Sequence, residues 1–237
     1  MKITHSVLSD AGPRVVNEDT ADCWLSGDVT MACVADGLGG MGGGDIASQL
    51  AVASFRAFLN DKEKTEETLI AAARDAHSKI RSAQQSGERQ KRMATTLTAV
   101  ALTTEGLIGV HCGDSRAAIA RGKGIKKLTR DHSEGQRLFE AGKLTKDELA
   151  TYQRRHILES ALGDKDEPRI EAFSLEIRPG DRVFLTSDGV HNIILLRELQ
   201  KMALVSPNPS DLVDKIRLAI NERGAIDNFS IAVIYVD

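Results

Sequence analysis

Aromatic residues are scarce in this sequence, at 4% of 237 residues, and neither sign of charge dominates it. Lys and Arg total 31 against 34 Asp and Glu, which gives a net charge of −3. Nucleic-acid binding usually requires a basic excess, and base stacking requires aromatic side chains, so we expect no nucleic-acid partner. No segment approaches the run of roughly 18 apolar residues that a transmembrane helix needs, so we also expect no membrane association.

Cysteine is sparse as well. Cys23, Cys33 and Cys112 are far apart in the chain, lie in apolar contexts and show no CxxC spacing. An odd and unclustered set argues against a disulfide framework or a zinc site, and it favours buried thiols in a reducing compartment. The first ten residues lack the apolar core of a signal peptide. We therefore expect a cytoplasmic protein, and we expect it to be a monomer.

The sequence contains both apolar runs typical of strands and periodic patterns typical of helices. Strands are expected at 29–35, 96–102, 107–112, 117–120, 125–128, 170–177, 182–186 and 228–236. Helices are expected at 45–59, 64–85, 133–141, 146–154, 195–203 and 210–222. Blocks of strands that alternate with blocks of helices favour an α+β fold in layers.

Short turns connect several of these strands. The segments 103–106, 121–124 and 178–181 would each close a hairpin, so the strands should be mostly antiparallel. The polar stretches 86–93 and 204–209 are expected to be loops too short to divide the chain. We therefore predict a single domain over residues 1–237.

Aspartates stand at the ends of the predicted strands. Asp36 follows 29–35, Asp114 follows 107–112, Asp188 follows 182–186, and Asp227 precedes 228–236. One Asp-Gly after a strand is usually a turn, but four such carboxylates could meet at one edge of a packed sheet. Crowded carboxylates repel one another, and a divalent cation relieves that repulsion. Oxygen ligands without His or Cys select Mg²⁺ or Mn²⁺, and this many carboxylates suggest two ions, an arrangement that activates water for attack on a phosphoryl group.

The glycine-rich stretch 37–44 has a rival interpretation. Gly37, Gly39 and Gly42 satisfy the dinucleotide-binding pattern GxGxxG after a strand and before a helix. That pattern needs a second strand ending in an acidic residue about 20 positions further on, whereas 57–67 reads AFLNDKEKTEE. No Gly-Lys-Ser/Thr follows, which excludes a P-loop. The stretch is better explained by backbone that approaches a metal or a phosphate closely.

Eight short blocks occur in order between residues 14 and 228. They are Arg14-x-x-Asn17-Glu18-Asp19, Val34-Ala35-Asp36-Gly37-Leu38-Gly39-Gly40, Ala94-Thr95-Thr96, Gly113-Asp114-Ser115-Arg116, Leu128-Thr129-x-Asp131-His132-Ser133, Ala161-Leu162-Gly163, Ser187-Asp188-Gly189 and Asp227-Asn228. With them the chain resembles the PP2C (PPM) metal-dependent Ser/Thr protein phosphatases, particularly the bacterial type. The resemblance implies an αββα sandwich of two antiparallel sheets flanked by helices. It implies hydrolysis of phosphoserine and phosphothreonine in phosphorylated proteins by a water activated at two metals, opposing a cognate Ser/Thr kinase in signalling.

The resemblance also implies a metal-binding role for most of these carboxylates. Asp36 would bridge two metal ions, and the backbone carbonyl of Gly37 would bind one of them. Asp188 and Asp227 would be the remaining ligands of the other ion. The cofactors implied are two, and at most three, Mn²⁺ or Mg²⁺ ions per chain.

Four further site features follow from the same resemblance. Asp19 would be a water-mediated or outer ligand, and Asp114 would bind the third metal that bacterial members hold. Arg14 would be the phosphate-binding arginine, whose fork suits two phosphate oxygens. The segment 131–165 would form the flap beside the active site.

The chain departs from the family pattern at two positions. Leu38 stands where eukaryotic members carry a histidine proposed as general acid, and Ala94 stands where a glycine usually precedes Thr-Thr. His111 and His132 could replace that histidine by residue type alone, and a structural role is the better interpretation of both. Two alternatives stay open: a phosphatase-like binding module, disfavoured because every expected carboxylate is present, and a phosphohydrolase of small nucleotides.

Overall fold

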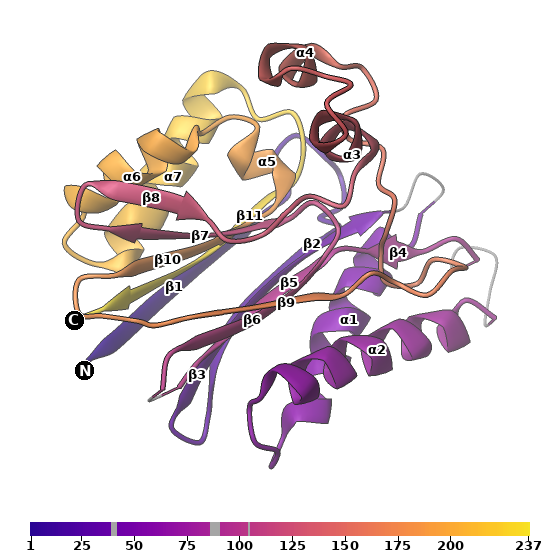
Figure 1. Ribbon diagram of the computed structural model, residues 1–237, viewed down its shortest axis with the longest axis horizontal. Helices are drawn as coiled ribbons and strands as arrows, with labels where there is room; N and C mark the ends of the chain where they lie inside the picture. Colours follow the sequence, from indigo (N-terminus) through magenta and orange to yellow (C-terminus); the bar gives the residue numbers. More distant parts are fainter. Residues whose placement is uncertain (39–41, 86–90, 104) are drawn as a thin grey trace.

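Two antiparallel β-sheets pack face to face, and helices cover both outer faces (Figure 1). The computed structural model describes residues 1–38, 42–85, 91–103 and 105–237. The predicted αββα sandwich is confirmed. Gly39 and Gly40 of the glycine-rich block, and positions 86–90 of the predicted loop 86–93, lie outside the described residues.

The first sheet has the strand order β1-β11-β10-β7-β8. Its strands are β1 (Ile3–Asp10), β11 (Phe229–Val236), β10 (Arg182–Thr186), β7 (Arg116–Arg121) and β8 (Gly124–Lys127). The helices α5 (Asp188–His191), α6 (Leu196–Leu204) and α7 (Pro209–Arg223) lie on its outer side (Figure 1). The two ends of the chain meet in this sheet, because β1 pairs with β11 along its whole length.

The second sheet has the order β2-β3-β5-β6-β9, and the two-residue strand β4 (Ala94–Thr95) pairs with β3. Its strands are β2 (Asp19–Ser26), β3 (Val29–Leu38), β5 (Leu97–Leu102), β6 (Leu107–Cys112) and β9 (Glu171–Leu175). The long helices α1 (Gly44–Leu59) and α2 (Glu66–Ala83) cover it. Two short helices, α3 (Glu134–Glu140) and α4 (Lys146–Thr151), stand apart from both helix layers in the segment predicted as a flap (Figure 1).

Strand β3 shows how alternation along one strand builds two cores. Ala32 and Val34 face the other sheet, whereas Met31, Cys33 and Ala35 pack under α1 and α2. All five are fully buried. Burial on both faces requires apolar side chains at successive positions, which explains the unbroken apolar run that predicts this strand.

One predicted hairpin is wrong. The segments around 170–177 and 182–186 do form β9 and β10, but β9 pairs with β6 in the second sheet and β10 pairs with β7 and β11 in the first. The turn between them therefore passes from one sheet to the other. Its Asp181 is fully buried, accepts hydrogen bonds from both Nε and Nη2 of Arg121 at 2.7 Å, and accepts the Arg178 backbone N–H at 2.8 Å. These side-chain contacts fix a crossing that the turn sequence alone does not distinguish from a hairpin.

The other two hairpins, β5–β6 and β7–β8, are confirmed. The six predicted helices are present, with ends shifted by a few residues. The strands β1, β2 and β4 and the single-turn helix α5 are additional to the prediction. Among the described residues, no helix is both long and apolar enough to span a bilayer.

Candidate active site

One cavity of about 520 Å³ opens where the ends of the two sheets meet. All seven predicted site residues line it: Arg14, Asp19, Asp36, Gly37, Asp114, Asp188 and Asp227. The wall also contains Val15, Val16, Glu18, Leu38, His156, Leu158 and Asn228. The prediction that aspartates at strand ends converge is therefore confirmed. The carboxylates come from the start of β2, the end of β3, the β6–β7 turn, the start of α5 and the residue two positions before β11.

Asp19 and Asp36 are direct partners in the antiparallel ladder of β2 and β3. Asp19 is buried, and its Oδ2 accepts a 2.6 Å hydrogen bond from the Ser187 hydroxyl. Ser187 is fixed in turn, because its oxygen accepts the Ser230 backbone N–H at 2.9 Å. The Ser-Asp-Gly block at the end of β10 therefore supplies both a carboxylate and the hydroxyl that orients a second carboxylate.

The two threonines before β5 hold the backbone of Asp36. The Asp36 N–H donates to Thr96 Oγ1 at 2.9 Å, and the Asp36 carbonyl accepts the Thr96 N–H at 2.9 Å. The Thr95 hydroxyl donates to the same carbonyl at 2.9 Å. The Ala-Thr-Thr block is thus explained as a support for the carboxylate at the centre of the cavity.

Gly37 occupies a position where no side chain fits. A Cβ atom there would lie 2.3 Å from the carbonyl oxygen of Gly44 and 2.5 Å from that of Glu18. The Gly37 N–H donates to the same Glu18 carbonyl at 3.1 Å. The close packing of three backbone segments therefore requires the glycine, independently of any role for its own carbonyl.

The cavity holds a cluster of carboxylates with little positive charge near them. Burial, reinforced by Asp188, raises the pKa of both Asp19 and Asp114 to about 7. Burial and the neighbouring carboxylates, Asp19 first among them, raise the pKa of Asp36 well above its ordinary range. The pKa of Asp188 is raised by burial and by Asp227. Buried carboxylates that repel one another and have no cationic partner resist ionisation, so the site favours a bound cation.

Arg14 provides the single ion pair that these five carboxylates form within the described part of the chain. Its Nη2 lies 2.9 Å from Asp227 Oδ2, and both side chains are about half exposed. The loop that carries Arg14 is held by Asn228, whose Nδ2 donates to the carbonyls of Ala11 and Val16 at 2.7 and 3.1 Å. The Asp-Asn block before β11 thus positions the cationic loop beside the acidic cluster.

The oxygen donors present fit divalent metal ions. The cavity carries five aspartates and only one paired arginine, and carboxylate oxygens are the ligands that Mg²⁺ and Mn²⁺ prefer. Charge compensation by a bound cation would remove the repulsion that raises their pKa values.

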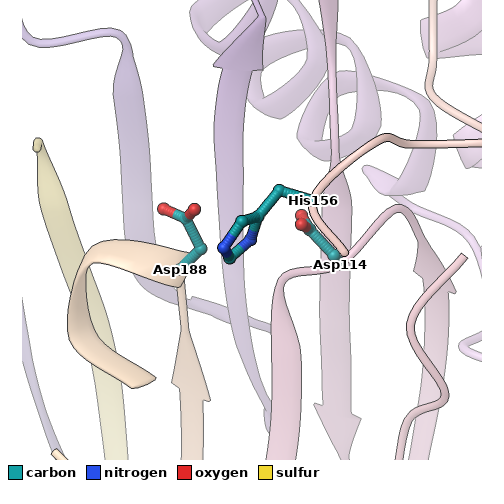
Figure 2. Close-up of side chains that lie close together, drawn as sticks. All are labelled: Asp114, His156 and Asp188. Atoms are coloured by element: carbon teal, nitrogen blue, oxygen red, sulfur yellow. The ribbon is translucent and has the colours of Figure 1, made fainter. Parts of the chain in front are cut away.

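His156 is a cavity residue that the sequence analysis does not identify. Asp114, His156 and Asp188 each offer one ligand atom, and these atoms all lie within 4.8 Å of one another. Figure 2 shows the three side chains converging from three different segments, with the imidazole between the two carboxylates. His156 lies in the predicted flap, where the sequence RRHIL matches none of the metal or catalytic spacings considered. Only the folded chain brings it to the aspartates.

The two histidines considered as replacement acids have structural roles. His111 is buried, with its ring nitrogens 2.9 Å from Thr98 Oγ1 and from the carbonyl of Arg130. His132 is also buried, and its Nδ1 accepts the Gly113 N–H at 3.2 Å. Neither lines the cavity. Burial lowers the pKa of both, to about 3 for His111.

Comparison with known proteins agrees with this geometry. The model of the family "Protein phosphatase 2C" matches residues 14–217. Protein phosphatase PhpP of Streptococcus pneumoniae (serotype 2, strain D39) is 30% identical over 236 residues, which cover 97% of this chain and 96% of PhpP.

Solved structures share the whole fold. The S. agalactiae serine/threonine phosphatase superposes with a TM-score of 0.92 at 27% identity, with 100% of both chains covered. The catalytic domain of the serine/threonine protein phosphatase PstP in complex with two manganese ions gives a TM-score of 0.85 at 29% identity, with 99% of both chains covered. The sandwich, its acidic cavity and these relatives together identify a protein phosphatase with the αββα fold. The chain belongs to the protein phosphatase 2C family.

Proposed function

We propose that this chain is a metal-dependent protein phosphatase that hydrolyses phosphoserine and phosphothreonine. The observation that carries the proposal is the convergence of five aspartates and Arg14 on one cavity at the ends of both sheets. The family match and the manganese complex of the related PstP domain support it. Divalent cations, when bound there, would activate water and neutralise charge on a phosphoryl group.

The proposed ligand assignment is the one that the family resemblance implies, and the shared cavity of these residues supports it. Asp36, at the centre of the acidic cluster, would bind both ions, and the Gly37 carbonyl would bind one of them. Asp188 and Asp227 would complete the second ion's protein ligands. Asp19, already held by Ser187, would act as an outer ligand. Asp114 would serve a third cation.

Arg14 is the group that would hold the substrate phosphate. It lies at the cavity wall on a loop fixed by Asn228, and its guanidinium can donate two parallel hydrogen bonds to phosphate oxygens. Catalysis would rest on placing positive charge around the equatorial oxygens of the phosphoryl group. The cavity chemistry calls for no covalent intermediate on the protein.

The residues that line the cavity favour a protein substrate over a small nucleotide. Exposed Val15 and Val16 line its mouth and offer apolar contact to an extended peptide. No Phe, Tyr or Trp is among the lining residues that the structure describes, so a base would find no stacking surface there. We further propose one domain over residues 1–237, a cytoplasmic monomer that opposes a Ser/Thr kinase, and Mn²⁺ or Mg²⁺ as the cellular metal.

A phosphatase assay tests the proposal. We expect a phosphothreonine peptide and p-nitrophenyl phosphate to be hydrolysed with Mn²⁺, and we expect EDTA and Asp36→Asn to abolish both reactions. Asp22→Asn is the matched control, since Asp22 lies on the same strand as Asp19 but pairs with Arg56 outside the cavity. Full activity of Asp36→Asn would overturn the metal site. Hydrolysis of nucleotides in preference to the phosphopeptide would favour the small-nucleotide phosphohydrolase.

A further inference from the structure

The flap contributes a nitrogen donor to the edge of the acidic cavity. His156 joins Asp114 and Asp188, with one ligand atom from each lying within 4.8 Å of the other two (Figure 2). Ligand atoms bound to one cation must lie this close to each other. The three residues come from the flap, from the β6–β7 turn and from the start of α5, so the fold itself creates the group.

Backbone contacts on both sides of His156 fix its position. The Ile157 carbonyl accepts the Glu134 N–H at 2.9 Å, and the Arg155 N–H donates to the Tyr152 carbonyl at 3.2 Å. A Cβ on Gly135 would lie 2.8 Å from the Arg155 Cα, so α3 packs directly against this turn of the flap.

Side-chain hydrogen bonds to α3 also hold this segment. Arg154 donates from Nε to Oε1 of Glu134 at 2.9 Å and from Nη2 to Oε2 at 2.7 Å. The Tyr152 hydroxyl donates to the same carboxylate. Glu134 thus ties the residues just before His156 to the first turn of α3, and the imidazole reaches the cavity from a braced segment.

The backbone next to Asp114 is also held by specific contacts. Gly113, at φ +109°, packs on Thr96 and turns the chain towards the cavity. Its N–H donates to His132 Nδ1 at 3.2 Å, and its carbonyl accepts the His132 N–H at 2.7 Å. Within the described residues, the Asp114 carboxylate forms no ion pair, and its neighbour Asp188 is a second carboxylate. The braced, unpaired carboxylate is suited to a cation.

We infer that His156 is a nitrogen ligand of a divalent cation held together with Asp114 and Asp188, and that this site prefers Mn²⁺ to Mg²⁺. The inference rests on the proposed function for the presence of metal in the cavity. A carboxylate–carboxylate–imidazole set suits the transition metals, whereas Mg²⁺ favours oxygen ligands alone. The cation would also link the flap to the acidic cluster, since His156 belongs to the flap and the two aspartates belong to the sheet ends.

Electron spin-echo spectroscopy of the Mn²⁺-loaded full-length protein tests the inference directly, because an imidazole ligand modulates the echo through its ¹⁴N nucleus. We expect this modulation in the wild type and its loss in His156→Ala. His5→Ala is the matched control, since His5 is exposed on β1, and it should retain the modulation. By calorimetry, His156→Ala should lower the Mn²⁺ affinity of one site at least about tenfold, since even partners outside the ligand shell change affinity about 10–100-fold. Its Mg²⁺ affinity should stay unchanged.

The outcomes separate the inference from the proposed function. Modulation that persists in His156→Ala, or a wild type that binds Mn²⁺ and hydrolyses phosphopeptide with no ¹⁴N modulation, would overturn the inference alone. A wild type that binds no Mn²⁺ would overturn both. An equal loss of Mn²⁺ and Mg²⁺ affinity in His156→Ala would overturn the claimed preference between the metals.

Discussion

Asp19 and Asp36 face each other directly across the antiparallel ladder of β2 and β3. Cross-strand partners project to the same face of a sheet, about 4.5–5.5 Å apart at Cβ, and like charges at such positions destabilise the pair. Ser187 donates to Asp19 at 2.6 Å, and Asp36 has no cationic partner within the described residues. The fold therefore places two carboxyl groups where they cannot both ionise without cost, which raises their pKa values in the absence of a cation.

Replacing Asp36 should raise the stability of the metal-free protein and lower its activity. Asp36→Asn removes a buried carboxyl group that cannot ionise in the crowded cluster without cost, so we expect the metal-free variant to melt above the metal-free wild type, by about 2–4 °C for each kcal/mol of that cost. The same variant should lose at least about 100-fold in phosphopeptide hydrolysis, in line with the loss of a main electrostatic group. Scanning calorimetry with EDTA and a kinetic assay with Mn²⁺ measure the two effects. Asp22→Asn should show neither, and a lower melting temperature for Asp36→Asn would contradict the repulsion.

Ser187 should matter for metal binding although it is not a proposed ligand. Ser187→Ala removes the hydroxyl that donates to Asp19 Oδ2 at 2.6 Å and weakens the support of a buried carboxylate. Loss of such an orienting partner typically lowers metal affinity about 10–100-fold, and we expect Mn²⁺ affinity measured by calorimetry to fall within that range. Ser174→Ala, on the exposed side of β9, is the control and should bind Mn²⁺ like the wild type. Unchanged affinity in Ser187→Ala would show that Asp19 needs no support.

The stability of the metal-free protein should depend on pH through Asp114. Burial and the neighbouring Asp188 raise the pKa of Asp114 from 3.8 to about 7. Between those values the folded state keeps a proton that the unfolded state gives up, so this group's contribution to stability falls as pH rises from about 4 to about 7. Asp114→Asn and the wild type should therefore melt at similar temperatures near pH 4. The variant should become the more stable of the two by pH 8, and a melting difference independent of pH would count against the raised pKa.

Arg14 should affect substrate binding most. Hydrogen bonds between charged groups contribute about 1.5–3 kcal/mol, so Arg14→Ala should raise KM for a phosphothreonine peptide about tenfold or more. Arg14→Lys should recover only part of the loss, because an ammonium group lacks the planar fork. Arg56→Ala serves as the control, since Arg56 pairs with Asp22 on the outer side of the second sheet. Steady-state kinetics with KM equal to that of the wild type would remove Arg14 from phosphate binding.

The sequence predicts the acidic cluster because its residues sit at recognisable places. An apolar strand followed by Asp-Gly or Ser-Asp-Gly locates Asp36 and Asp188 without any knowledge of sheet order. The short loops of the β5–β6 and β7–β8 hairpins fix their pairing locally. Convergence of strand ends at one edge of a sandwich then follows from antiparallel packing.

What the sequence does not predict depends on contacts between distant residues. Strand β1 is stabilised by β11, more than 200 positions away, and its own sequence ITHSVLSD has weak alternation. The crossing from β9 to β10 depends on Arg121 binding the buried Asp181. His156 reaches the cavity from a turn of the flap that Glu134 and Gly135 of α3 hold through Arg154 and Arg155. Each of these is a tertiary contact with no local sequence signature.

Anomalous diffraction from crystals of the wild-type protein grown with Mn²⁺ tests the central claim most directly. The account predicts at least two manganese peaks in the cavity, two of them bound by the Asp36 carboxylate, with Asp188 and Asp227 oxygens on one of these two. Crystals in which manganese is absent from the cavity, or in which Asp36 contacts no metal, would contradict it.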